Sequence, residues 1–231
     1  MLSRRHFIEG TVGLGLVAGL VAGFAPAALA QRRTQTETVD VAQLMQPGPL
    51  GDVWLGRADA PVTIVEYASL TCGHCATFHV NTLPELKKKY IETGKVRLVF
   101  REFALNQLDA AVYMLTRCAL NADGKAGEGV DPTRYFALVE VFFQQQRTWA
   151  FGGNPLEAVT AITRQAGITQ VQFETCLNNQ AILDALNATR ERASSAFGVE
   201  STPTFFINGR RMLGAQPMAE FEKIIDPLLP A

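Results

Sequence analysis

Two β patterns separated by a long helical stretch constrain the fold of this chain most. The apolar, β-branched letters VTIVEYA predict a strand over Val62–Ala68, a helical pattern follows over residues 73–92, and KVRLVFREF predicts a strand over Lys95–Phe103. Short links in this order indicate a parallel pair with a right-handed crossover. Later, Asn208-Gly209 between TFFI and RRML predicts a β-hairpin, and a helix follows from Pro217 to Leu229. Neither β part could bury a core alone, so we predict one α/β sheet with helices on both faces.

The segment between the two β parts, residues 107–195, carries no strand pattern. Alanine and aliphatic residues recur there at helical spacing. We therefore predict an all-helical domain inserted into an α/β domain that is formed by residues 51–106 and 196–231. The expected helices lie around Asp109–Asn121, Pro132–Gln146, Asn154–Gly167, Gln170–Asn178 and Ala181–Phe197.

The predicted helix over residues 73–92 has two different sides. Pro84 lies inside it and should kink it, because proline lacks the backbone N–H. One side should be buried and consists of Phe78, Leu83, Leu86 and Tyr90. The other side should be a solvated face that carries His79, Lys87, Lys88 and Lys89.

The first thirty residues have the pattern of an export signal. Arg4 and Arg5 give a basic start, no charge appears between Glu9 and Arg32, and the stretch closes on Ala28-Leu-Ala30, which suits a signal peptidase. The twin-arginine and Sec routes both stay open. A retained membrane anchor is the alternative, since the apolar run is long enough to span a bilayer. Residues 31–50 are expected to form a flexible leader.

From these features we expect a mature chain outside the cytoplasm, where disulfides persist. The formal net charge of −1 and the absence of a basic stripe argue against a nucleic-acid partner.

Two of the four cysteines, Cys72 and Cys75, stand where the first strand leads into the helix. A metal clip, a structural staple and a reversible redox pair are three possible reasons for this pair. Cys72 at a helix start faces backbone N–H groups without intrahelical partners, which favour a negative sulfur. His74 adds an imidazole nearby, and Cys75 can reach back to resolve a mixed disulfide. These residues therefore favour a redox pair with Cys72 as nucleophile.

The other two interpretations fit less well. A zinc site needs more ligands than this pair supplies, and Cys118 and Cys176 lie far away without C-x-x-C partners, so no metal is expected. A staple between residues so close in sequence removes little entropy from the unfolded chain.

The chain resembles the DsbA family of exported thiol–disulfide oxidoreductases of the thioredoxin superfamily. The resemblance rests on Cys72-Gly73-His74-Cys75 at a helix start, Pro84 in that helix, the helical insertion, and Thr202-Pro203 before the hairpin. It implies a thioredoxin fold over roughly residues 51–231 and no cofactor. CGHC departs from the Pro-His pair usual in DsbA and is the tetrad usual in protein disulfide isomerase, which leaves the redox poise open.

The resemblance also implies roles for residues outside the tetrad. Pro203 is expected as a cis-proline that holds Thr202 beside Cys72 for an extended substrate, although such a proline can also simply begin a strand. Glu66 is expected as a buried acid on the face of Val62 and Ile64, where it could relay a proton for Cys75. A solvent-facing or ion-paired Glu66 is the alternative.

A second disulfide is expected between Cys118 and Cys176, as in some alphaproteobacterial relatives, with two buried free thiols as the alternative. We therefore predict a periplasmic thiol–disulfide oxidoreductase that acts on exported proteins with cysteines and on a DsbB-like membrane partner. A disulfide isomerase or reductase kept reduced by a DsbD-like partner, and a non-catalytic copper-binding or holdase protein, are the alternatives.

Overall fold

The computed structural model describes residues 38–127 and 130–230. The predicted export signal over residues 1–30 lies outside them. Residues 36–231 form one compact unit. Within the described part of this unit, no helix is both long and apolar enough to cross a membrane.

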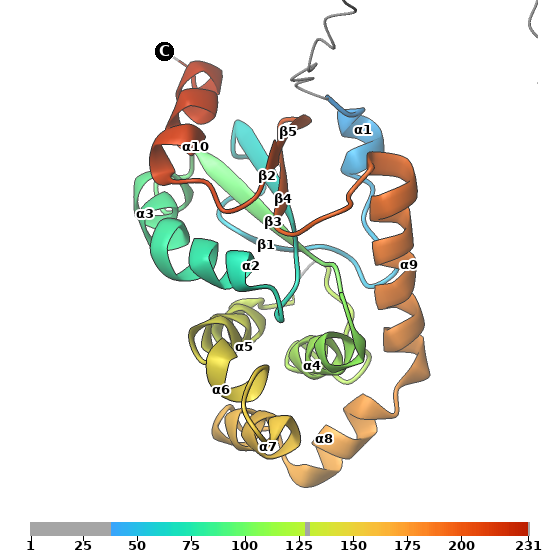
Figure 1. The fold of residues 1–231 in the computed structure, drawn as a ribbon. Coiled ribbons are helices and arrows are strands. Elements are labelled where there is room, and N and C mark those ends of the chain that lie inside the picture. The colour runs from blue at the N-terminus through green and yellow to red at the C-terminus, as the bar shows by residue number, and fades with distance from the viewer. Residues whose placement is uncertain (1–37, 128–129, 231) are drawn as a thin grey trace, which may run out of the picture. The chain divides into compact units, whose positions relative to one another are not determined.

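A five-stranded mixed sheet runs through the molecule in the order β1-β3-β2-β4-β5 (Figure 1). Its central strands β2 and β3 are parallel, as predicted, and the other neighbours are antiparallel. The hairpin turns at Asn208 and Gly209, whose φ angles of 44° and 87° suit the primed turns that join twisted strands. The strands are β1 Val53–Leu55, β2 Val62–Ala68, β3 Val96–Glu102, β4 Thr204–Ile207 and β5 Arg210–Leu213.

The predicted helix over residues 73–92 is one helical run with two widened segments. It consists of α2 Gly73–Thr77, η1 Phe78–Thr82, α3 Leu83–Leu86 and η2 Lys87–Ile91, where η1 and η2 are π-helical. Pro84 lies in α3 between the two widened segments, and a missing backbone N–H is a common cause of such irregularity. The predicted apolar side is buried in full, at Phe78, Leu83, Leu86 and Tyr90.

This helix and the C-terminal helix α10, Met218–Ile225, cover one face of the sheet, and η3, Asp226–Leu228, follows. Phe78 packs against Phe205 of β4 and Phe221 of α10, with ring centroids 4.7 and 5.4 Å apart. Burial of one such ring stabilises the fold by about 1.5–3 kcal/mol. The helix that begins at the cysteine pair is therefore fixed to the sheet along its length.

The segment between β3 and β4 is helical, as predicted, and most of it gathers at one end of the sheet (Figure 1). Its last helix, α9, runs out of this helical block and ends against the opposite face of the sheet, where Ala193 and Phe197 share a core with Tyr67 and Phe206. The helices are α4 Gln107–Cys118, α5 Thr133–Gln144, α6 Gln146–Trp149, α7 Pro155–Gln165, α8 Gln170–Leu177 and α9 Gln180–Phe197.

The segment before β1 is structured from Thr38 on, so the prediction of a flexible leader is wrong for residues 38–50. Thr38 bridges to Arg210 of β5, and α1, Val41–Leu44, follows. Leu44 and Leu50 are buried, at 1% and 6% exposure. A leader that buries apolar side chains in this way is part of the fold.

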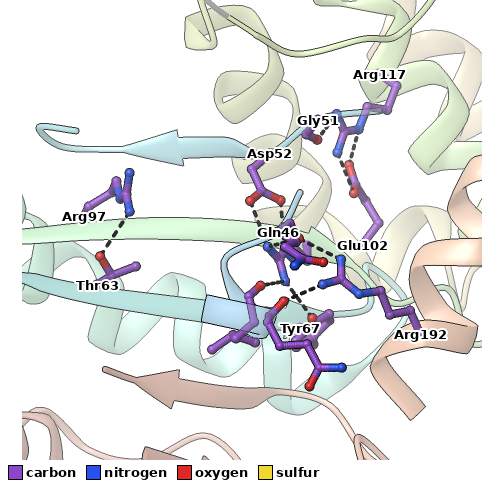
Figure 2. A network of polar contacts seen from close by, with 12 residues as sticks. Gln46, Gly51, Asp52, Thr63, Tyr67, Arg97, Glu102, Arg117 and Arg192 are labelled. Atoms are coloured by element: carbon purple, nitrogen blue, oxygen red, sulfur yellow. Dashed lines mark hydrogen bonds and ion pairs between the residues drawn. The ribbon is translucent and has the colours of Figure 1, made fainter. Parts of the chain in front are cut away.

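Arginines from distant elements hold this segment in place (Figure 2). Arg101 of β3 donates to both carboxylate oxygens of Asp52, at 2.9 and 2.8 Å, and to the carbonyl of Leu44 at 2.8 Å. Arg192 of α9 donates to the carbonyl of Gln46 at 2.7 Å. The sequence of the segment alone did not reveal this order, because its hydrogen-bond donors come from residues far along the chain.

Candidate active site

Cys72 lies at the N-cap of α2, just beyond the C-terminal end of β2. Its backbone is extended, with φ −86° and ψ 120°, so its side chain stands at the open end of the helix. The Sγ atom is half-buried and donates to the carbonyl oxygen of Thr202 at 3.2 Å. Both cysteines of the tetrad are free thiols, and Cys75 is fully buried one turn further on.

The two thiols differ strongly in acidity. The pKa of Cys72 is lowered to about 5, first by a hydrogen bond from the Cys75 thiol and then by the nearby Thr202 side chain and the backbone N–H groups of Cys75 and His74, while partial burial opposes them. Burial raises the pKa of Cys75 well above its ordinary value, and its neighbours Cys72 and Glu66 raise it further. Near neutral pH the site therefore offers one thiolate and one protonated thiol.

The other two residues of the tetrad are exposed. His74 acts on Cys72 through its backbone N–H, whereas the sequence suggested its imidazole. A β-carbon added at Gly73 would meet no atom within 4 Å, so no packing constraint demands glycine there. Gly73 and His74 thus form an exposed side of the active site, which a large partner can reach.

The Thr202–Pro203 peptide bond is cis, as the resemblance implied. It leads directly into β4, where Thr204 pairs with Tyr67 of β2. The sheet thereby brings residues 130 positions apart in the chain, Cys72 and Thr202, into hydrogen-bond contact.

The helical block holds the loop that carries Cys72. Asp109 of α4 accepts from the backbone N–H of Leu70 with one carboxylate oxygen and from that of Leu105 with the other, both at 2.9 Å. Burial raises the pKa of Asp109 to about 6. Gln146 of α6 donates to the carbonyls of Leu70 and Cys72, at 2.7 and 2.9 Å. No pattern in the sequence identifies Gln146. Near Asp109 the local signal is Asn106, which caps α4 by accepting from the Asp109 N–H.

Glu66 of β2 is fully buried, and its Oε1 lies 3.0 Å from Nε2 of His79. His79 is itself 8% exposed and stacks on Phe143 of α5 with centroids 4.0 Å apart. The prediction that His79 lies on a solvated face is therefore wrong: the π-helical segment η1 begins at Phe78 and leaves His79 directed inward. Lys87 is partly exposed, and Lys88 and Lys89 are exposed, as expected.

Cys118 and Cys176 form a disulfide that links α4 to α8 inside the helical block. This pairing agrees with the expectation from the resemblance, and the alternative of two free thiols does not hold. The described residues contain no cluster of three or more His, Cys, Asp or Glu side chains that could hold a metal ion.

Comparison with known proteins agrees with this geometry. A family model described as thioredoxin matches residues 50–227. The crystal structure of Wolbachia pipientis alpha-DsbA1 has a TM-score of 0.72 at 30% identity, over 82% of this chain and 96% of that one. The protein-disulfide isomerase of Novosphingobium aromaticivorans, at 24% identity and a TM-score of 0.63, shares the fold.

A Rickettsia prowazekii protein with the provisional name protein-disulfide oxidoreductase is 36% identical over 158 residues, 68% of this chain. This chain matches only 54% of the length of that relative. The disulfide bond formation protein D of Bacillus subtilis is 22% identical over 199 residues, 83% of each chain.

Proposed function

Because this chain belongs to the DsbA-like family of thioredoxin-fold protein-disulfide oxidoreductases, we propose that it introduces disulfide bonds into exported proteins in the periplasm. The observation that carries this proposal is the unequal acidity of its two thiols. Cys72 has a pKa of about 5 and is half-buried, whereas Cys75 is buried and has a raised pKa. A low-pKa thiol is a good leaving group, which favours the release of a disulfide to a substrate.

The reaction proceeds by two thiol–disulfide exchanges. A substrate thiolate attacks Sγ of Cys72 in the oxidised protein, the Cys72–Cys75 bond breaks, and Cys75 leaves and takes up a proton. A second substrate thiolate then attacks the substrate sulfur of the mixed disulfide. Cys72 departs as the thiolate that its hydrogen-bond donors stabilise, and the substrate keeps the new disulfide. Oxidation by a DsbB-like membrane partner would reverse these steps at Cys72.

The backbone beside Cys72 supports a role in holding the substrate. The Thr202 carbonyl lies 3.2 Å from Sγ of Cys72, at a strand end where an extended peptide could pair with the chain. Neither the Cys72 thiolate nor a mixed disulfide at Cys72 carries a hydrogen on Sγ, so in both states the Thr202 carbonyl is open to a substrate N–H.

The tetrad gives one reason to consider an isomerase or reductase. CGHC lacks the proline usual between the cysteines of DsbA, so a more moderate potential is expected. A protein kept reduced by a DsbD-like partner would then use Cys72 to attack wrong disulfides. A copper-binding or holdase role has no comparable support, since it would not require two thiols of such different acidity.

The reduction potential of the Cys72–Cys75 pair tests the proposal. We expect equilibration with glutathione to give about −180 mV, and the oxidised protein to restore activity to reduced, unfolded ribonuclease. A potential near that of thioredoxin, about −270 mV, would assign the reductase function instead. Tight Cu(I) binding without ribonuclease oxidation would favour the non-catalytic alternative.

A further inference from the structure

Glu66 and His79 form a buried polar pair behind the cysteines. They come from different elements, β2 and η1, and their side chains are 0% and 5% exposed. Oε1 of Glu66 contacts Nε2 of His79, but Oε2 of Glu66 is buried without a hydrogen-bond partner. A buried oxygen without a hydrogen bond lowers the free energy of unfolding by about 1–3 kcal/mol. The unpaired Oε2 is therefore unfavourable for stability.

The carboxylate of Glu66 is electrostatically coupled to Cys75. The negative charge of Glu66 is among the causes that raise the Cys75 pKa, which places the carboxylate within electrostatic reach of that thiol. Cys75 itself is fully buried and needs a base before it can attack a mixed disulfide on Cys72. Glu66 is the acidic residue that influences Cys75, but it is fully buried, and among the described residues its hydrogen-bond partner is His79.

His79 connects this buried acid to a cavity. The cavity has a volume of about 230 Å³, and its lining includes His79, Pro84, Phe136 and the ion pair between Lys87 and Glu140. Nε2 of His79 contacts Glu66, and among the described residues Nδ1 has no hydrogen-bond partner. The imidazole thus has one nitrogen on the acid and one nitrogen available to the cavity. Stacking on Phe143 and edge contacts with Phe78 and Phe100 hold the ring in this orientation.

We propose that His79 is a positioning residue that carries the Cys75 proton from Glu66 to solvent through this cavity, away from the substrate-binding side. The inference rests on the proposed function, because it concerns the step in which Cys75 attacks a mixed disulfide on Cys72. The π-helical segment η1 supports it, since such segments occur frequently at functional sites and here direct His79 inward.

The step balances in protons and electrons. The Cys75 thiol proton moves to Oε2 of Glu66, the proton shared by Oε1 and Nε2 stays within the pair, and Nδ1 of His79 releases one proton to water in the cavity. The pair gains one proton and loses one. The Cys75 sulfur then forms the bond to Sγ of Cys72, the bond from Cys72 to the partner sulfur breaks, and the partner leaves as a thiolate.

A single-turnover reaction with oxidised glutathione tests this proposal. Acid quenching and mass spectrometry follow two steps separately: formation of the Cys72–glutathione mixed disulfide, and its resolution by Cys75. We expect His79→Ala to leave the first step unchanged and to slow the second about 100-fold, at the lower end of the range for acid–base catalysis. Imidazole should restore the rate of His79→Ala, because the removed ring leaves space beside the cavity.

His79→Phe is the matched control, since it fills the same space and should be slow with or without imidazole. His79→Gln keeps a donor for Glu66 without a transferable proton; it should fold and be as slow as His79→Ala, and it replaces that variant if His79→Ala is unstable. Wild-type resolution rates in His79→Gln, or equal restoration of His79→Phe by imidazole, would overturn the proposal. A wild-type protein that never forms the mixed disulfide would instead refute the proposed function.

Discussion

At the scale of single residues, the two active-site thiols influence each other. The hydrogen bond from the Cys75 thiol is the largest cause of the low Cys72 pKa, ahead of the backbone N–H groups at the helix start. The sequence indicated that the helix start and the His74 imidazole would lower the Cys72 pKa, because both lie next to Cys72 along the chain. It could not show that the resolving thiol is itself the main donor, because that depends on the side-chain geometry.

The pKa of Cys72 should therefore respond to the ability of residue 75 to donate a hydrogen bond. Cys75→Ala removes the donor and should raise the Cys72 pKa from about 5 toward its ordinary value of 9. Cys75→Ser keeps a donor and should raise it less. Ultraviolet absorbance of the thiolate across a pH titration measures both variants, and alkylation by iodoacetamide should follow the same curve. Identical pKa values in the two variants would contradict this account.

The same lowered pKa predicts how stability depends on pH. The folded protein holds the Cys72 thiolate down to about pH 5, whereas the unfolded thiol ionises near 9. The extra stability of the reduced form is therefore fully present above pH 9, partial at neutral pH, and lost as the pH falls through 5.

Urea unfolding of the reduced and oxidised forms, with Cys118–Cys176 intact, measures this difference. We expect the free energy of unfolding of the reduced form to increase relative to that of the oxidised form as the pH rises from 5 to 9. An oxidised form that is more stable at neutral pH would support the reductase alternative.

At the scale of elements, the helical block does more than cover the sheet, because α4 and α6 hold the loop that presents Cys72. Gln146 donates from one Nε2 atom to two loop carbonyls, and it is 5% exposed. Loops at active sites need such support when their own backbone groups have no partner in the sheet.

Gln146→Glu tests this support with almost no change in size. The substitution removes both donors and leaves two carbonyls facing a carboxylate, so we expect a loss of about 2–4 kcal/mol in the free energy of unfolding. The Cys72 alkylation rate should also change, since the loop carries that residue. Gln145→Glu introduces the same charge at the exposed neighbouring position and is the control. A loss as large in the control would show that charge, not loop support, is responsible.

At the scale of the whole molecule, the strand–helix–strand pattern and the Asn208-Gly209 turn were enough to predict the central sheet, because both are local signals. The inserted helices were also predictable from their spacing. Strand β1 was missed because Val53–Leu55 is too short to show alternation. Glu66 was predicted on the correct face, but its partner His79 was not, because helical periodicity assumes a regular helix and η1 is π-helical.

The disulfide within the helical block should act on stability more than on activity. It closes a loop across 58 positions, which is worth about 4 kcal/mol in the chain-entropy model. Replacing Cys118 and Cys176 by serine should lower the melting temperature and leave ribonuclease oxidation measurable. Loss of all oxidation by a variant that still melts cooperatively would show that this disulfide takes part in the reaction.

The bridge between Thr38 and Arg210 has a practical consequence for handling this protein. Arg210 pairs across the hairpin with Ile207, near the start of β2, whereas Cys72 follows the end of β2. An affinity tag or a bead attached ahead of Thr38 would therefore join the domain at the end of the sheet opposite the thiols. Under the proposed function, protein immobilised in this way could be regenerated by flowing oxidant and reused as a solid-phase catalyst for refolding secreted proteins.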